Sequence, residues 1–279
     1  MIVAKEFPNK EFATKDELFK ELILNEKTLI SQKKGINKEA DSVSYFVEVD
    51  NGKGEAIKAS STTPQLLDAG KMKAKVVINT TGLLDSHGDV HIKGLWKKSV
   101  DEQKGLLLLQ EHQMKFDKII SDNVTPTLKT MSWKSLGFDF DGSTQALVFE
   151  TEIDKNRNEF MFEQYAKGYV KEHSVGMRYV NIQMAINSEE KWASDYKDTW
   201  DKYYDEIVNK KDADAQGYFW AVTEAKIVEG SAVVKGSNFA TPTISIEAVK
   251  EDTSTETEPP VGTQNEKHEQ LLKELLNKF

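Results

Sequence analysis

The chain has 279 residues, of which 30% are charged, with a net charge of −9 and no cysteine. No segment concentrates Lys and Arg, which disfavours a primary role in nucleic-acid binding. The lack of cysteine excludes disulfides, Cys-ligated zinc and a cysteine nucleophile. The longest purely aliphatic run, Leu106 to Leu109, is far too short to span a bilayer, and the first residues lack a secretory-signal layout. We expect a soluble intracellular protein with one sizeable domain plus appendages, or two small domains.

Residues 1–42 are expected to form an N-terminal helix and a linker. Thr14-Lys-Asp-Glu17 is a capping box, in which the hydroxyl and Glu17 satisfy the first amides of the helix. An apolar stripe continues the helix to about residue 31 and consists of Leu18, Phe19, Leu22, Ile23 and Leu24. The polar stretch 33–42 then links the helix to the core.

The core, residues 43–250, is dominated by short β-like segments. We expect strands at 44–49, 74–79, 106–111, 146–152, 170–180 and 221–234, separated by turn signals such as Asp141-Gly. A helix at 158–167 is expected to pack through Phe160, Met161, Phe162 and Tyr165. The predicted class is α+β: a β-rich barrel or folded sheet with covering helices.

Two further segments have distinct compositions. Residues 187–216 are charged, and Trp192, Tyr196, Trp200 and Tyr203 recur at helical spacing, which predicts an inserted helix packed on the core. A stacking platform for nucleic acid is disfavoured because the insert is not basic. Residues 251–265 are rich in Glu, Thr and Pro and are predicted to be disordered, and 266–279 are predicted to form a tethered amphipathic helix suited to docking.

The segment 85–91 alternates Asp85, His87, Asp89 and His91. An extended backbone would place all four side chains on one side, where they could hold a divalent metal. The alternative is a turn, in which Asp85 accepts backbone amides, Gly88 takes an unusual φ and Asp89 caps or pairs locally. The turn is favoured, because metal sites usually recruit a ligand from elsewhere in the chain.

Two residues are candidates for nucleophilic catalysis. His112 ends an aliphatic run, where a partly buried imidazole could act as a general base, although this residue alone favours a structural histidine bonded to backbone at the strand end. Ser174 lies in a predicted strand two residues before Gly176, and a glycine there would let another backbone approach the serine. His173 should face the opposite side from Ser174 and is a poor base for it. Glu172 stands where an α/β-hydrolase elbow needs glycine, which excludes that fold.

A carboxylate follows downstream. Simple alternation would place Ala225, Ile227, Glu229 and Ser231 on one mainly apolar face, with Glu224 pointing the other way. A carboxylate on such a face needs a partner. That partner could be a histidine oriented toward a serine, or equally a Lys or Arg.

Four segments in this order resemble the prohead (capsid-maturation) serine proteases of tailed bacteriophages, a family related in fold to the herpesvirus assemblins. The segments are Asp85 to Asp89 with Gly94-Leu-Trp and Ser99, Leu108 to His112, Gly168 to Gly176, and Glu224 to Val234 with Asn238 and Ala240. The resemblance spans about residues 76–242. It departs from the family pattern at Ile119-Ile120, at Gly230 and at Gly236-Ser237.

The resemblance implies a serine endopeptidase that cleaves capsid and scaffold proteins, and itself, during phage head maturation. It implies Ser174 as nucleophile, His112 as base and Glu229 as the residue that orients His112, with Glu224 in reserve. Backbone amides of Val175 and Gly176 are candidate oxyanion donors. No cofactor is expected, the partners would be capsid and scaffold proteins with self-association open, and the location would be the procapsid in the host cytoplasm. An inactive scaffold with the protease fold, or a metal-dependent hydrolase using residues 85–91, are the alternatives.

Overall fold

The computed structural model describes residues 1–35, 63–102 and 104–249, and Met1–Val249 form one compact unit. Its α+β class agrees with the sequence prediction. The strands form two larger sheets and one small pair, and within the described ranges the sheets stay open and do not close into a barrel. The predicted strand 44–49, most of the linker 33–42, the segment 251–265 and the helix 266–279 lie outside the described residues.

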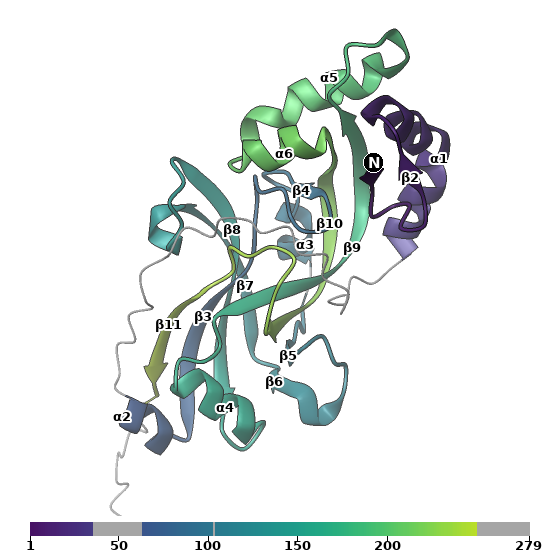
Figure 1. The fold of residues 1–279 in the computed structure, drawn as a ribbon. Coiled ribbons are helices and arrows are strands. Elements are labelled where there is room, and N and C mark those ends of the chain that lie inside the picture. Colours follow the sequence, from purple (N-terminus) through teal and green to yellow (C-terminus); the bar gives the residue numbers. More distant parts are fainter. Residues whose placement is uncertain (36–62, 103, 250–279) are drawn as a thin grey trace, which may run out of the picture. The chain divides into compact units, whose positions relative to one another are not determined.

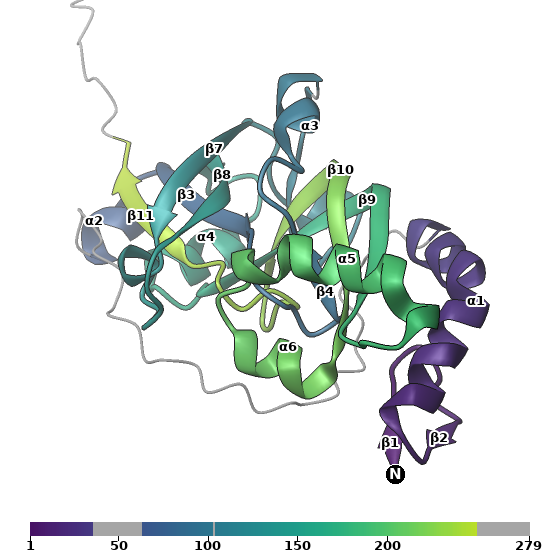
Figure 2. The same cartoon turned by 90° about the horizontal axis from the view of Figure 1, so that it is seen from above.

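The first large sheet is antiparallel, in the order β11-β3-β8-β7. Its strands are β3 (Lys71–Thr80), β7 (Val124–Ser132), β8 (Ser143–Asp154) and β11 (Thr243–Ala248). β3 begins with strict alternation of exposed lysines and buried residues, which predicts a strand with one face on the core. Figure 2 shows these strands as a group separate from β4, β9 and β10.

The second large sheet is built around the long strand β10 (Tyr218–Val233). β9 (Glu172–Ile186) pairs antiparallel with β10 along one edge, and the two run side by side in Figure 1. On the other edge, β4 (Asp89–His91) pairs with the first part of β10 and β5 (Leu108–Gln110) with the last part, both in parallel. β6 (Ile119–Ser121) pairs with β5.

One hydrophobic core lies between the two sheets. Ile78 and Phe149 from the first sheet belong to the same buried cluster as Val175 and Ile227 from the second. Each of these side chains is less than a tenth exposed. Burial of apolar area at about 25 cal/mol per Å² is the main force that holds the sheets together.

Between β4 and β5, no strand of the described residues pairs with this edge of β10. The segment around α3 (Lys97–Glu102) supplies backbone and side-chain acceptors there instead. The Leu95 carbonyl accepts from the Ala225 amide at 3.4 Å, and the Ser99 hydroxyl accepts from the Ile227 amide at 2.8 Å. Because a buried amide without an acceptor is costly, these two bonds let β10 continue through a stretch that has no neighbouring strand on this edge.

The N-terminal part comprises β1 (Ile2–Val3), β2 (Glu11–Phe12) and α1 (Lys15–Gly35). The Glu17 amide donates to the Thr14 hydroxyl at 3.2 Å, as the capping box predicts, and the Glu17 carboxylate accepts from the Ala13 amide. The predicted apolar stripe is wrong at Leu24, which is 80% exposed, while Leu22 is fully buried. Two residues along an α-helix turn the chain by about 200°, so these neighbours face opposite sides.

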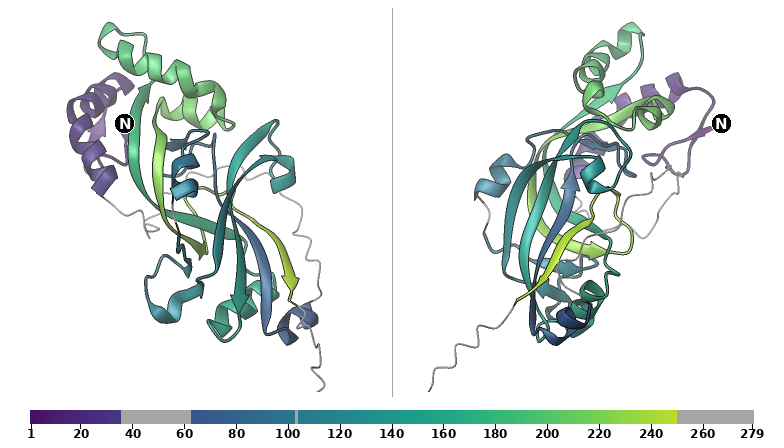
Figure 3. Two further views of the ribbon diagram at one scale, coloured as in Figure 1. Left: turned by 180° about the vertical axis from the view of Figure 1, so that it is seen from behind. Right: turned by 90° about the vertical axis from the view of Figure 1, so that its left-hand side faces the viewer.

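The insert 187–216 is helical, as predicted, with η3 (Lys191–Ala193), α5 (Ser194–Tyr203), η4 (Tyr204–Glu206) and α6 (Lys210–Gln216). Trp200 and Tyr203 are buried, and Trp192 and Tyr196 pack partly buried against the core. Tyr196 also donates to the Glu26 carboxylate of α1 at 2.9 Å, and Figure 3 shows α1 and α5 at the same end of β9.

The remaining helical elements are α2 (Thr63–Asp68), η1 (Phe116–Lys118), η2 (Lys134–Leu136) and α4 (Glu159–Ala166). α4 confirms the helix predicted at 158–167, and its Asn158 cap accepts from the Met161 amide. Phe160 is 60% exposed, so the prediction that it packs on the core is wrong. Within the described residues, no helix is both long and apolar enough to cross a membrane.

Candidate functional site

A β-bulge in β10 decides which way Glu229 points. Ile227 pairs with Met177 and Glu229 pairs with Gly176, so β10 has one extra residue where β9 has none. Directly paired residues share a face, and Met177 and Gly176 are consecutive, so Ile227 and Glu229 lie on opposite faces of the sheet. The expectation from simple alternation, that Glu229 shares the face of Ile227, is therefore wrong. Ile227 faces the core, and Glu229 faces the other side together with Ser231.

His112 reaches this face through a tight turn at the end of β5. Both Glu111 and His112 have positive φ, 50° and 56°, which is unusual for residues with a side chain. The Glu111 amide still donates to the Ala232 carbonyl of β10 at 2.9 Å, and the turn follows directly. Each such residue costs about 1–3 kcal/mol and persists only where its surroundings fix it.

Three residues form a closed hydrogen-bonded ring. The Nδ1 of His112 lies 2.5 Å from Oε1 of Glu229, the Ser231 hydroxyl donates to Oε2 of Glu229 at 2.6 Å, and the His112 amide donates to the Ser231 hydroxyl at 3.0 Å. All three residues are at most 5% exposed. Because a carboxylate only accepts, Nδ1 of His112 carries the proton in this bond. The lone pair of the neutral imidazole is then on Nε2.

Ser174 lies beside this ring. It pairs directly with Ser231 across β9 and β10, so the two side chains share a face of the sheet. Ser174 is partly exposed, whereas Ser231 is fully buried with its hydroxyl engaged as both donor and acceptor. Of the two hydroxyls, Ser174 is therefore the one that a ligand can reach.

The imidazole Nε2 of His112 is buried and makes no hydrogen bond to any described residue, Ser174 included. A buried polar atom without a hydrogen-bond partner is rare in folded proteins, and a catalytic role is one of the reasons for such an atom. In structures without substrate, catalytic hydrogen bonds are often long and tighten only when substrate binds. The arrangement therefore offers a base with a free nitrogen on the same face as an accessible hydroxyl.

Gly176 makes room for Glu229. A Cβ at position 176 would overlap the Glu229 carboxylate, so only glycine allows the carboxylate to lie against β9 at this point. The sequence interpretation, that the glycine admits a backbone or an extended peptide, needs this correction. Gly230 has a similar role on the core face, where a Cβ would overlap Phe149 and Ile78. That contact explains a glycine between Glu229 and Ser231.

The two candidate oxyanion donors face opposite edges of β9. The His173 amide donates to the Thr241 carbonyl on the edge away from β10. Because amides alternate along a strand, the Val175 amide also faces away from β10, and the Gly176 amide faces toward it. Val175 is thus better placed than Gly176 to donate to a ligand near Ser174.

Neither His173 nor Glu224 belongs to this cluster. His173 is fully buried, with Nε2 2.9 Å from the Tyr165 hydroxyl and Nδ1 3.0 Å from the Thr241 carbonyl. Burial lowers the pKa of His173 to about 4. Glu224 lies 3.7 Å from the ammonium of Lys98, with a side chain that is 36% exposed. The structure thus brings His112 together with Glu229, and not with the reserve carboxylate.

The segment 85–91 forms the predicted turn. Oδ1 of Asp85 accepts from the amides of His87 and Asp89 at 2.8 and 2.9 Å, and Gly88 has a φ of 74°. Ligand atoms of Asp85, His87 and Asp89 lie within 4.8 Å of one another, and His91 stands apart, 2.8 Å from Asn79. The extended arrangement of four ligands is therefore wrong.

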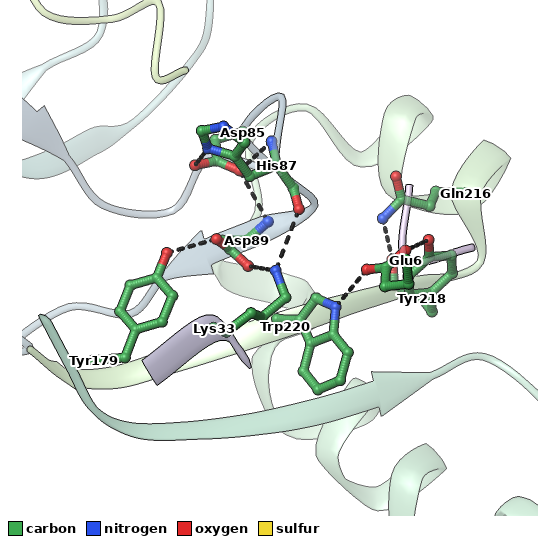
Figure 4. A network of polar contacts seen from close by, with 9 residues as sticks. All are labelled: Glu6, Lys33, Asp85, His87, Asp89, Tyr179, Gln216, Tyr218 and Trp220. Carbon is green, nitrogen blue, oxygen red and sulfur yellow. Dashed lines mark hydrogen bonds and ion pairs between the residues drawn. The ribbon is translucent and has the colours of Figure 1, made fainter. Parts of the chain in front are cut away.

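A lysine already supplies positive charge to this turn. Figure 4 shows the ammonium of Lys33 directed at the buried carboxylate of Asp89, 2.7 Å away, and Tyr179 donating to the second oxygen of Asp89 at 2.5 Å. The same figure shows Glu6 accepting from Tyr218 and Trp220. These bonds attach the N-terminal part to β4 and β10, which is a structural role.

The alternation of strand residues already predicts that Glu229 and Ser231 share a face, but it does not indicate that the Ser231 hydroxyl binds both Glu229 and His112. Comparisons of the chain with protein-family models, with curated proteins and with solved structures found no match.

Proposed function

We propose that the protein is a serine endopeptidase in which Ser174 is the nucleophile, His112 the general base and Glu229 the residue that orients His112. The observation that carries the proposal is the buried His112–Glu229 pair, which lies on the same face of the sheet as the accessible Ser174. A nucleophile, a base with a free nitrogen and a carboxylate behind that base are the parts that acyl transfer requires.

The reaction follows from these positions. The Ser174 hydroxyl oxygen attacks the scissile carbonyl carbon while Nε2 of His112 takes its proton, and the carbonyl oxygen becomes an oxyanion. The Val175 amide is the proposed donor to that oxyanion. When the C–N bond breaks, Nε2 returns the proton to the leaving amine. Water, deprotonated by Nε2, then attacks the acyl carbon, the ester C–O bond breaks, and Nε2 returns the proton to the Ser174 oxygen.

Glu229 has two effects in this scheme. It keeps the proton of neutral His112 on Nδ1, so that Nε2 is free to accept, and it stabilises the imidazolium that forms during attack. On substrate binding, a rotation of the Ser174 side chain would bring its hydroxyl to Nε2, since catalytic hydrogen bonds often form only in the substrate complex.

The biological role follows from the resemblance to prohead proteases of tailed bacteriophages and to an assemblin-like fold. The substrates would be capsid and scaffold proteins and the chain itself, inside the assembling procapsid. The α+β class of the described residues agrees with the class that this resemblance implies.

A fluorophosphonate, which reacts with activated serines, tests the mechanism without a known substrate. We expect labelling of the full-length protein at Ser174, located by peptide mass spectrometry, and its loss in Ser174→Ala, His112→Ala and Glu229→Gln. His87→Ala is the matched control, since it removes another histidine outside the cluster, and it should be labelled like wild type. Labelling that persists in both Ser174→Ala and His112→Ala would contradict the serine mechanism.

Co-expression with the capsid and scaffold proteins of the same phage tests the substrates. Wild type should shorten these proteins and Ser174→Ala should not. Cleavage that survives Ser174→Ala but stops with a chelator would favour the metal-dependent alternative at Asp85, His87 and Asp89. A wild type that neither cleaves nor reacts with the fluorophosphonate would favour the inactive scaffold.

A further inference from the structure

We propose that Ser231 is a positioning residue that fixes His112 and Glu229 together in the orientation needed to activate Ser174. This inference rests on the proposed serine mechanism and adds to it a hydroxyl that touches none of the reacting atoms. Three strands meet at this residue: it lies on β10, pairs with Ser174 of β9 and binds the residue that ends the turn after β5.

The hydroxyl of Ser231 restrains His112 in two ways, directly at its backbone and indirectly, through Glu229, at its imidazole. It accepts the backbone amide of His112 at 3.0 Å and donates to Oε2 of Glu229 at 2.6 Å, while Oε1 of Glu229 holds the imidazole. One hydroxyl therefore links the backbone of the base to the carboxylate that orients its ring. A hydroxyl is suited to this place because it combines one donor with acceptor lone pairs.

The backbone of His112 needs such a restraint. Glu111 and His112 both have positive φ, a conformation that residues with side chains adopt only when neighbouring contacts impose it. The hydrogen bond from the His112 amide to the Ser231 hydroxyl supplies a restraint of this kind. Without it, the turn would relax and carry the imidazole away from Ser174, even if Glu229 remained in place.

Ser231 itself is excluded as the nucleophile by its surroundings. Its exposed fraction is 0%, and both hydrogen-bonding capacities of the hydroxyl are used within the ring. Removal of its hydroxyl would leave a buried amide and one buried carboxylate oxygen without their partner. The expected defect is thus a misplaced base, rather than a missing reactive group.

Ser231→Ala tests the inference, with Ser121→Ala as the matched control. Ser121 is also buried, and its hydroxyl also accepts a backbone amide, that of Asn123 at 3.1 Å, while it donates to the Glu152 carbonyl at 2.6 Å. Both variants lose a buried hydroxyl that is donor and acceptor, but of the two only Ser231 contacts His112 and Glu229. Ser231→Thr retains the hydroxyl and serves as the rescue variant.

The first measurement is the rate of fluorophosphonate labelling at Ser174 as a function of reagent concentration. For Ser231→Ala we expect a maximal rate about 100-fold lower with little change in the half-saturating concentration, because a misplacement of about 1 Å has an effect of that size. Ser231→Thr should recover at least a tenth of the wild-type maximal rate, and Ser121→Ala should stay within about twofold of wild type. A Ser231→Ala rate equal to that of Ser121→Ala would overturn the inference.

The second measurement does not depend on activity. In the unreactive Ser174→Ala background, NMR should show the Nδ1 proton of His112 as a downfield signal, owing to its bond to Glu229. A further Ser231→Ala substitution should shift or broaden this signal, and a further Ser121→Ala substitution should not. An unchanged signal with Ser231→Ala would overturn the positioning role. If wild type is not labelled at all, the proposed function fails, and the NMR comparison still decides whether Ser231 holds His112.

Discussion

Gly176 and Glu229 are paired across β9 and β10, and the Glu229 carboxylate occupies the space that any side chain at position 176 would need. This relationship links a glycine on one strand to the orientation of an acid on the next. Because β9 and β10 are paired on both sides of this position, a shift of either backbone to admit a methyl group would break that pairing. The carboxylate would have to leave its place beside His112.

Gly176→Ala should therefore strongly lower the reactivity of Ser174 without changing any candidate catalytic residue. We expect fluorophosphonate labelling at Ser174 to fall at least about 100-fold. The unfolding free energy should fall by about 1–3 kcal/mol, the usual range for overpacking. Gly70→Ala is the control, because a Cβ there meets nothing within 4 Å. A Gly176→Ala variant that is labelled as fast as Gly70→Ala would show that Glu229 does not need this space.

Glu229→Gln should be far more damaging than Glu224→Gln. An amide at position 229 can donate to Nδ1 of His112, which would move the imidazole proton to Nε2 and remove the base. We expect labelling at Ser174 to fall by roughly 1,000-fold or more, as for loss of the third member of a catalytic triad. Glu224 contacts Lys98 near the surface, so its variant should stay within about twofold of wild type. Equal losses in both variants would argue against the specific role of Glu229.

The buried imidazole of His173 should make the fold sensitive to acid. Its pKa is lowered to about 4 by burial, from a usual value of 6.5. Between these values the unfolded chain binds a proton that the folded protein does not, so stability falls as the pH drops from about 6.5 to about 4. The free energy of unfolding should fall by about 3 kcal/mol over this range; the full stability is present above pH 6.5, and this part of it is lost below the folded pKa.

Urea unfolding at pH 7 and pH 4 measures this effect. His173→Gln is expected to be less stable than wild type at pH 7, because both ring nitrogens of His173 have partners. Its loss of stability between pH 7 and pH 4 should nevertheless be smaller than that of wild type by about 3 kcal/mol. Identical losses in the two proteins would mean that His173 does not titrate in this way.

The ion pair between Lys33 and Asp89 should contribute more to stability than an ordinary surface pair. The Asp89 side chain is fully buried and that of Lys33 is 14% exposed, so Lys33→Met would remove a positive charge 2.7 Å from a buried carboxylate. We expect a loss of about 3 kcal/mol in the free energy of unfolding. Lys10→Met, which breaks a pair with Glu21 where the lysine is 50% exposed, should cost about 0–1 kcal/mol. Equal effects of the two substitutions would contradict this difference.

Local patterns in the sequence were sufficient for most of the secondary structure. The capping box at Thr14, the helix α4, the aromatic spacing of the insert and the strands β3, β8, β9 and β10 follow from periodicity and capping alone. The errors at Leu24 and Phe160 concern single positions on helices, where the apolar character of one residue does not determine its face. A pattern with a fixed period predicts the type and position of an element better than it predicts which of its side chains are buried.

The candidate site shows the limit of such patterns. The residues alone made His112, Ser174 and Glu229 candidates, and the family resemblance implied their roles, with Glu224 in reserve. Strand alternation made His173 a poor base, because consecutive strand residues face opposite sides. It also placed Glu229 on the face of Ile227, which is wrong, because a strict alternation cannot register one extra residue. The bulge is defined by the pairing of β10 with β9, and the Ser99 hydroxyl accepts the Ile227 amide beside it. Only the tertiary structure therefore decided that Glu229 and Ser231 face His112, since contacts between segments distant in the sequence set that face.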